Sequence, residues 1–258
     1  MSKILSGLLL IGLLGASAQA DLIRVEMGAG IWQNEVSGTV ETFTGSVLDG
    51  GYDTDILGYD KETKPYVWMY IKHPVPVLPN LRLEYAAIDY SGAAKVPFTY
   101  EGTTYGVNTT SDLTLNQYDL IMYYNILDNT AWTTIDLGLD VKIIEGEFTA
   151  TDASNPTNTV NDSETIPVPM AYVRGRVEIP ATDIGLEANM KYIGYGDSKV
   201  MDYAVKIDYT LADILPVDIG LELGYRFQQI DLDADDFSLD TTTKIEVDGI
   251  FAGAVVRF

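Results

Sequence analysis

Few residues of this chain could carry acid–base or nucleophilic chemistry. The sequence has one histidine, His73, and no cysteine. A histidine can serve as a general base because its pKa lies near neutral pH. His73 directly precedes Pro74 in a proline-rich segment that predicts a turn, which favours a structural position. The absence of cysteine excludes disulfides, thiolate catalysis and cysteine-ligated zinc.

Carboxylates are abundant, and two groups of them could do chemistry. Asp136 and Asp140 could form an acid–base pair, although they belong to a regularly alternating segment that explains them without catalysis. Residues 231–235 carry an aspartate at every second position, as at the start of a calcium loop. Asp236 stands where that loop needs glycine, and Thr242 where it needs a bidentate glutamate. We therefore expect a solvated acidic loop with weak divalent-cation binding, and no cofactor.

Charged and apolar residues alternate with a period of two, which is typical of strands with one polar and one apolar face. The alternation is clearest at 134–143, 184–192, 201–211 and 219–227. Less regular segments lie near 22–34, 64–73, 80–91, 113–127, 167–180 and 244–258. The sequence therefore predicts an all-β protein of about ten strands. Merging weak strands with nearby loops would change the number to eight or twelve.

The first twenty residues predict a cleaved bacterial export signal. Lys3 precedes an apolar run through Leu14, and Ala18, Gln19 and Ala20 form a small-x-small cleavage site. Cleavage near Ala20 would leave residues 21–258 as one domain. It would also leave 15 basic against 38 acidic residues, a net charge of −23. A chain this acidic is a poor partner for nucleic acid.

The apolar stretches are too short for a membrane helix, which needs about 20 apolar residues. A membrane position therefore requires a closed, antiparallel up-and-down β-barrel, because lipid cannot satisfy an open sheet edge. Short turns are predicted at 74–79, 128–130, 180–183 and 212–216. They alternate with long polar connections near 35–63, 92–111, 146–165 and 229–243, and with one tight hairpin at 195–198. This alternation is typical of transmembrane barrels.

The chain ends on Gly253, Val256 and Phe258, with Phe251 at a position that is usually polar. This ending resembles the assembly signal of small bacterial outer-membrane β-barrel proteins, including uncharacterised barrels of proteobacteria. The resemblance implies periplasmic chaperones, the barrel-assembly machinery and insertion into the Gram-negative outer membrane. Outer-membrane lipid and lipopolysaccharide would then be its surroundings. The family's enzymes act at the outer face with a histidine, whereas His73 is expected on a periplasmic turn, so we expect no enzymatic activity.

The tight turns predict which charges oppose each other inside the barrel. Opposed residues in an antiparallel pair have a constant sum of residue numbers, and the three turns between 180 and 216 give about 363, 393 and 428. These sums predict two rows of alternating sign on the inner wall: Arg176, Glu187, Lys206 and Glu222 in one, and Lys191, Asp202 and Arg226 in the other. Chance pairing on a water-facing surface is the alternative explanation.

Two functional hypotheses follow from this interior. A barrel of about ten strands is close to the eight-stranded size at which side chains nearly fill the inside. We therefore expect a largely filled, ion-paired lumen and an envelope-structural or surface-interaction role. The alternative is a narrow channel for small or cationic solutes, which acidic loops could concentrate.

Overall fold

A computed structural model describes residues 23–258 apart from 45–46, 76, 215 and 238–240, so the predicted export signal at 1–20 lies outside the described residues. The elements are β1 (Arg24–Thr44), β2 (Val47–Asp53), α2 (Thr54–Leu57), β3 (Glu62–Lys72), β4 (Asn80–Ala86), β5 (Asp89–Ala93), β6 (Phe98–Tyr100), β7 (Thr103–Tyr105), β8 (Thr110–Thr130), β9 (Thr133–Thr151), β10 (Thr159–Glu178), β11 (Ile184–Tyr195), β12 (Ser198–Ile214), β13 (Val217–Leu232), α3 (Ala234–Phe237) and β14 (Thr241–Arg257). No helix among them is long and apolar enough to cross a membrane.

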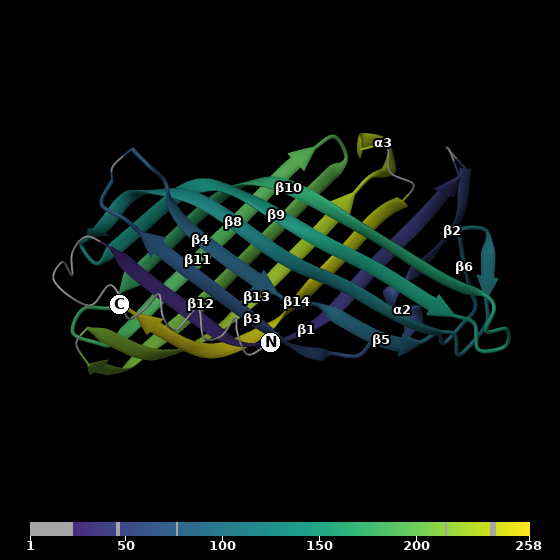
Figure 1. The fold of residues 1–258 in the computed structure, drawn as a ribbon, viewed down its shortest axis with the longest axis horizontal. Helices are drawn as coiled ribbons and strands as arrows, with labels where there is room; N and C mark the ends of the chain where they lie inside the picture. Colours follow the sequence, from purple (N-terminus) through teal and green to yellow (C-terminus); the bar gives the residue numbers. More distant parts are fainter. Residues whose placement is uncertain (1–22, 45–46, 76, 215, 238–240) are drawn as a thin grey trace, which may run out of the picture.

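The strands form a closed antiparallel barrel (Figure 1). Ten strands make its wall in the order β1, β3, β4, β8, β9, β10, β11, β12, β13 and β14, and β5 continues the line of β4 against β8. The ring closes where β14 pairs with β1 over seventeen residue pairs, from Glu26 with Arg257 to Thr42 with Thr241. The prediction of about ten antiparallel strands is therefore confirmed.

The start of β1, the end of β14 and the short turns lie at one end of the barrel, which we call the terminal end. The turns there join β3 to β4, β8 to β9, β10 to β11 and β12 to β13. The longer connections lie at the opposite end, which we call the loop end. The predicted tight hairpin is found there, with Gly196 at a φ of 60° between Tyr195 and Ser198.

The predicted long loops are mostly strand, so their predicted extent was wrong. β1 continues to Thr44, β9 reaches Thr151, β10 starts at Thr159 and β13 reaches Leu232. The loop-end parts of these strands were missed because their polar residues fall on the outward parity, opposite to the pattern that defined the first part of each strand.

The two faces of the wall exchange polarity along the barrel, as β9 illustrates. Towards the terminal end, Leu137 and Leu139 face outward and are exposed, while Asp136 and Asp140 face inward and are buried. Beyond residue 144 the outward side chains include Glu145 and Glu147, and the inward ones are Phe148 and Ala150. The same alternate positions of β9 point outward along its whole length. What changes along the strand is the polarity of the outward side chains, from apolar to charged.

The same exchange occurs on neighbouring strands. On β8 the outward series passes from Leu120 to Asn116, and on β14 from Ile250 to Asp248. The terminal half thus has the apolar exterior that lipid requires, and the loop half has the apolar interior of a water-soluble protein. We call the outward apolar surface of the terminal half the apolar band.

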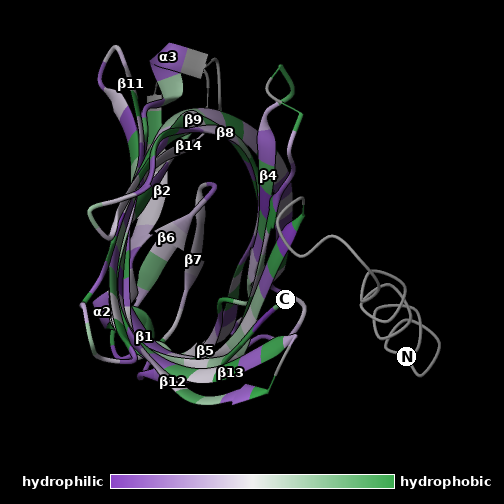
Figure 2. Ribbon diagram, turned by 90° about the vertical axis from the view of Figure 1, so that its left-hand side faces the viewer, coloured by the Kyte–Doolittle hydropathy of each residue, from purple (hydrophilic) through white to green (hydrophobic). Residues whose placement is uncertain are grey.

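The first two long connections close the loop end. β2 pairs with β1 and β6, and β6 pairs with β7, so these short strands lie off the closed ring. The end-on view in Figure 2 shows the oval ring with β6 and β7 inside its outline. Tyr52 of β2 stacks on Phe148 of the wall with ring centroids 4.3 Å apart, and Tyr100 of β6 lies 5.1 Å from the same ring. We call the segments 47–57 and 95–107 the aromatic plug.

Burial keeps the phenol of Tyr100, in the aromatic plug, protonated. The Tyr100 hydroxyl donates to Oδ2 of Asp162 on β10 at 2.8 Å. Burial, and then the hydrogen bond to the Asp162 carboxylate, raises the pKa of Tyr100, so the phenol keeps its proton at physiological pH. The plug is therefore attached to the wall by stacking, by the Tyr100–Asp162 hydrogen bond and by a hydrogen bond of 3.2 Å from the Gly106 backbone N–H to Asp152 at the end of β9.

The exchange of polarity along β9 predicts that an introduced cation destabilises the barrel at one outward position of this strand and has little effect at another. Leu139→Arg places a cation in the apolar band and is expected to lower the free energy of unfolding in lipid vesicles by about 2 to 4 kcal/mol. Glu147→Arg, on the same face beyond the band, is expected to change it by less than about 1 kcal/mol. Urea unfolding of both variants in vesicles measures the difference, and equal losses would contradict the assigned band.

Candidate functional site: the lumen charge cluster

The inward parity of the terminal half brings charged side chains from nine strands into one buried group, which we call the lumen charge cluster. Its eight cations are Arg82, Lys142, Arg174, Arg176, Lys191, Lys206, Arg226 and Arg257, and its nine carboxylates are Glu26, Glu84, Asp119, Asp136, Asp140, Glu187, Asp202, Asp208 and Glu222. Charges buried this deeply are costly unless they are paired.

The two hairpins between β10 and β12 have the expected registers. Arg176 lies opposite Glu187, and Glu187 lies opposite Lys206. Lys191 lies opposite Asp202. The ion-pair distances along these registers are long: 3.6 Å from Arg176 Nη1 to Glu187, 3.8 Å from Lys206 to Glu187 and 3.4 Å from Lys191 to Asp202. The closest partners of these residues lie elsewhere.

The register predicted for β12 and β13 was wrong by two residues. The structure pairs Lys206 with Gly224 and Ala204 with Arg226, a sum of 430 instead of 428. β12 continues to Ile214 before it turns, and a register shift between Thr210 and Ala212 adds a bulge residue. The later turn pairs Ile214 with Val217, a sum of 431, and the bulge residue then lowers the sum to 430 along the rest of the strand pair.

The two ion pairs expected from that register nevertheless form on the diagonal. Lys206 Nζ lies 2.8 Å from Glu222 Oε2, and Arg226 Nη2 contacts Asp202 Oδ2 at 2.5 Å. Long side chains reach partners displaced by two residues across a strand pair. The seven predicted lumen residues are therefore all buried together, with a different geometry from simple rows.

Several close contacts connect strands that are not neighbours in the wall. Lys191 of β11 lies 2.6 Å from Glu84 of β4. Lys142 of β9 lies 3.0 Å from Asp202 of β12, and Arg82 of β4 lies 3.1 Å from Glu187 of β11. The cluster thus crosses the lumen and joins opposite walls.

Several members of the cluster were missed from sequence. Asp208 bridges Arg176 of β10 at 2.6 Å and Arg257 of β14, and Arg174 lies 2.7 Å from both Asp136 and Glu187. The polar parity of each strand marks these residues as inward. Register sums from single hairpins could not find contacts across the lumen, because those depend on how the ring closes.

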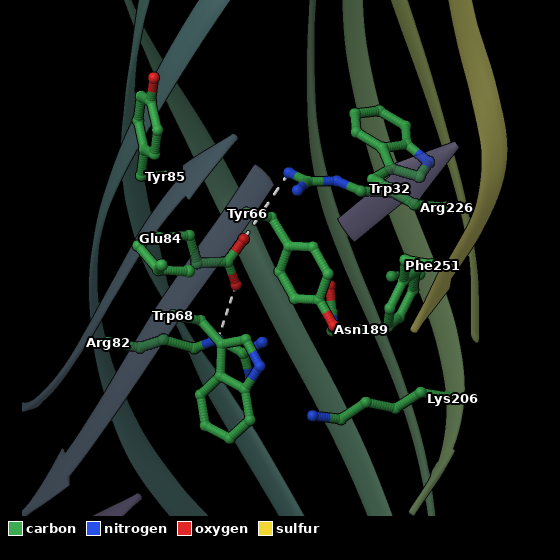
Figure 3. A pocket seen from close by; sticks show the side chains of 12 residues that line it. Trp32, Tyr66, Trp68, Arg82, Glu84, Tyr85, Asn189, Lys206, Arg226 and Phe251 are labelled. Atoms are coloured by element: carbon green, nitrogen blue, oxygen red, sulfur yellow. Dashed lines mark hydrogen bonds and ion pairs between the residues drawn. The ribbon is translucent and has the colours of Figure 1, made fainter. Parts of the chain in front are cut away.

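Aromatic residues of β3 complete the cluster on one side. Tyr66 and Trp68 both donate to Glu222 Oε1, at 2.6 and 2.9 Å. Lys206 Nζ lies 4.1 Å from the centre of the Trp68 ring. Figure 3 shows Trp68 between Arg82 and Lys206, and Tyr66 between Glu84 and Phe251. Gly28 of β1 leaves room for this arrangement, since a Cβ atom there would lie 2.2 Å from the Trp68 indole nitrogen.

The residues of the predicted assembly signal lie on the closing strand β14 and just after it. Gly253 pairs with Gly30 of β1, and a Cβ atom there would lie 2.5 Å from the Tyr66 hydroxyl. Val256 pairs with Met27, and the backbone of Phe258 donates to Val25 at 2.9 Å. The unusual Phe251 faces the lumen, where its ring packs edge-on against Tyr66 at 5.3 Å. Recognition by the assembly machinery stays a prediction.

His73 lies in the turn between β3 and β4. Its Nδ1 accepts from the Val75 backbone at 3.2 Å, and its Nε2 lies 3.0 Å from the carbonyl oxygen of Pro79. Both ring nitrogens are thus engaged by the turn's own backbone.

The acidic segment at 231–235 is split between β13 and α3, and Asp231 forms an ion pair with Lys199 at 3.4 Å.

Two cavities adjoin the cluster. One of about 250 Å³ opens at the terminal end and is lined by polar residues that include Arg24, Glu26, Arg174 and Arg257. The other, about 40 Å³, lies between the aromatic side chains of Figure 3 and Asn189, and has room for one or two waters. The first cavity is a polar vestibule whose inner wall is the charge cluster.

Comparison with solved structures assigns the fold. The outer-membrane protease OmpT from Escherichia coli superposes with a TM-score of 0.55 at 11% identity, covering 93% of this chain and 97% of that one. Ail of Yersinia pestis gives 0.39 at 10% identity, with coverages of 92% and 99%, and the Pseudomonas putida toluene transporter TodX gives 0.34 at 8%, with coverages of 95% and 92%. No family model and no curated protein matches the sequence. The chain thus has the fold of small bacterial outer-membrane β-barrel proteins.

The cluster predicts a large cost for removing its central carboxylate. Glu187 lies within 3.8 Å of four cations: Arg82, Arg174, Arg176 and Lys206. Glu187→Gln leaves these cations with too few anions and is expected to lower the free energy of unfolding by on the order of 3 kcal/mol. The exposed Glu147→Gln is the matched control and is expected to change it by less than about 0.5 kcal/mol. Equal urea midpoints for the two variants would refute a structural role for the cluster.

Proposed function

We propose that this protein is a sealed barrel of the Gram-negative outer membrane with an envelope-structural or surface-interaction role. The contacts that join opposite walls of the lumen carry this proposal. In addition to the ion pairs, Gln117 of β8 and Gln228 of β13 exchange hydrogen bonds of 3.0 and 2.7 Å across the interior. Side chains bonded to each other across a lumen leave little room for solute.

Two barriers in series support the sealed state. The first is the lumen charge cluster inside the apolar band, where each ion depends on its partners for stability. The second is the aromatic plug at the loop end, where Tyr52, Tyr100 and Phe148 pack together. A solute would have to separate ion pairs at one level and an apolar core at the other.

The apolar band supports the membrane location. Lipid requires exposed apolar side chains over a closed strand wall, and the terminal half supplies both. In this proposal the export signal is removed near Ala20, and chaperones and the barrel-assembly machinery deliver the chain. The short turns then face the periplasm, and the loop end faces outward among lipopolysaccharide.

We propose no enzymatic activity, although OmpT is a protease. The single histidine is held by backbone groups at the terminal end, far along the barrel from the aromatic plug. The alternative function is a narrow channel for small or cationic solutes. The polar vestibule favours this alternative, because it is a cavity of about 250 Å³ lined by polar residues.

Conductance across a planar lipid bilayer separates the two functions. The native protein is expected to give no discrete current steps at any voltage, because both barriers are intact. Discrete, salt-dependent current steps from the native protein would contradict the sealed barrel and support the narrow channel.

Variants that remove each barrier test the series arrangement. The lumen variant Asp202→Ala with Arg226→Ala removes a charge of each sign. In the plug variant a two-residue turn replaces 95–107, which is feasible because Ala94 and Thr109 are hydrogen-bonded neighbours at 2.8 Å. Each variant alone is expected to stay silent, and the combination is expected to conduct. Silence of a combined variant that still shows heat-modifiable gel migration would contradict the two-barrier arrangement.

A further inference from the structure

Asp140 of β9 differs from all other members of the lumen charge cluster. Its exposed fraction is 1%, and neither carboxylate oxygen accepts a hydrogen bond from any residue that the structure describes. Each of the other members has an oppositely charged group at ion-pairing distance. An ionised carboxylate in such a position would carry the full cost of its lost hydration.

The neighbours of Asp140 do not supply a counter-charge. The strand register places Ile121 of β8 and Met170 of β10 beside it, and both are buried and apolar. Lys142, two residues along β9, is already 2.7 Å from Asp119 and 3.0 Å from Asp202.

The titratable groups on the other strands around Asp140 do not provide a free counter-charge either. They are Asp119 and Tyr123 on β8, Lys142 on β9, Tyr172 on β10 and Lys191 on β11 across the lumen. Lys191 lies 2.6 Å from Glu84 and also contacts Asp119 and Asp202. Both lysines near Asp140 are therefore shared among other carboxylates.

Asp119 places a second carboxyl group on the diagonal from Asp140 across the β8–β9 pair, and its Oδ1 is likewise buried without a hydrogen-bond partner among the described residues. A carboxylate has no donor, so two carboxylates can form a hydrogen bond only if one of them carries a proton. Like charges this close cannot both be ionised cheaply. The count of the cluster agrees, because nine carboxylates face eight cations.

We propose that Asp140 is a binding site for one exchangeable positive charge, a proton shared with Asp119. Neither of the two cavities that adjoin the cluster is lined by Asp140, and a proton needs no cavity. With this proton bound, eight ionised carboxylates balance eight cations. The inner wall is then electrically neutral at the level of the apolar band.

The bound proton makes the barrel's stability depend on pH with a definite sign. At neutral pH the native state holds one proton more than the unfolded chain, in which an aspartate is ionised. The free energy of unfolding therefore falls as the pH rises from neutral. Removing the proton leaves an unpaired carboxylate between Ile121 and Met170.

Infrared spectroscopy of the folded protein tests the proposal directly. The native protein at neutral pH is expected to show the C=O stretch of a protonated carboxylic acid, which shifts in heavy water. Asp140→Asn is expected to abolish this band and to keep the fold, because the amide has the shape and the zero charge of the protonated acid. Asp112→Asn, which removes an outward carboxylate of β8, is the matched control and is expected to retain the band.

A second measurement keeps the test decisive. Urea midpoints between neutral and alkaline pH are expected to fall for the native protein and to fall less for Asp140→Asn. A native spectrum without an acid band that Asp140→Asn removes would overturn the proposal. So would a saturable dependence of the native midpoint on sodium that Asp140→Asn abolishes, because the bound charge would then be an alkali metal ion.

Discussion

The alternation of side chains across each strand is the constraint on which the rest of the structure depends. Because successive residues must face opposite sides of the wall, the residues between the lipid-facing ones point inward, and in the terminal half many of them are charged. Ten closed strands then collect seventeen charged groups in one narrow interior. These groups are stable only as partners of each other, so the pairing inside the lumen depends on the closure of the wall that brings them together.

The same constraint explains what the sequence could predict. Strand identity followed from alternation at 134–143 and similar segments, and the registers of β10 to β12 followed from tight turns. The loop-end parts of β9 and β10 were legible in principle, because Glu145 and Glu147 alternate with Phe148 and Ala150. They were assigned to loops because a polar exterior was expected only in loops, not in a strand that leaves the membrane.

Other features could not be found from local pattern. The turn between Ile214 and Val217 set the β12–β13 sum at 431, the bulge at Leu211 lowered it to 430, and no residue type in that segment predicts the bulge. The contacts of Arg82 with Glu187 and of Lys191 with Glu84 join strands more than 100 residues apart. Such pairs depend on ring closure and on the oval cross-section (Figure 2), which are properties of the whole barrel.

The exchange of polarity along the wall also sets the height of the molecule. From residue 144 to Thr151, β9 continues for eight residues beyond the apolar band, which is on the order of 25 Å of strand before tilt is counted. A collar of paired strands, filled with its own apolar core, therefore lies between the apolar band and the connecting segments of the loop end. In the membrane position proposed above, the connecting segments of the loop end meet any partner at a fixed distance from the bilayer.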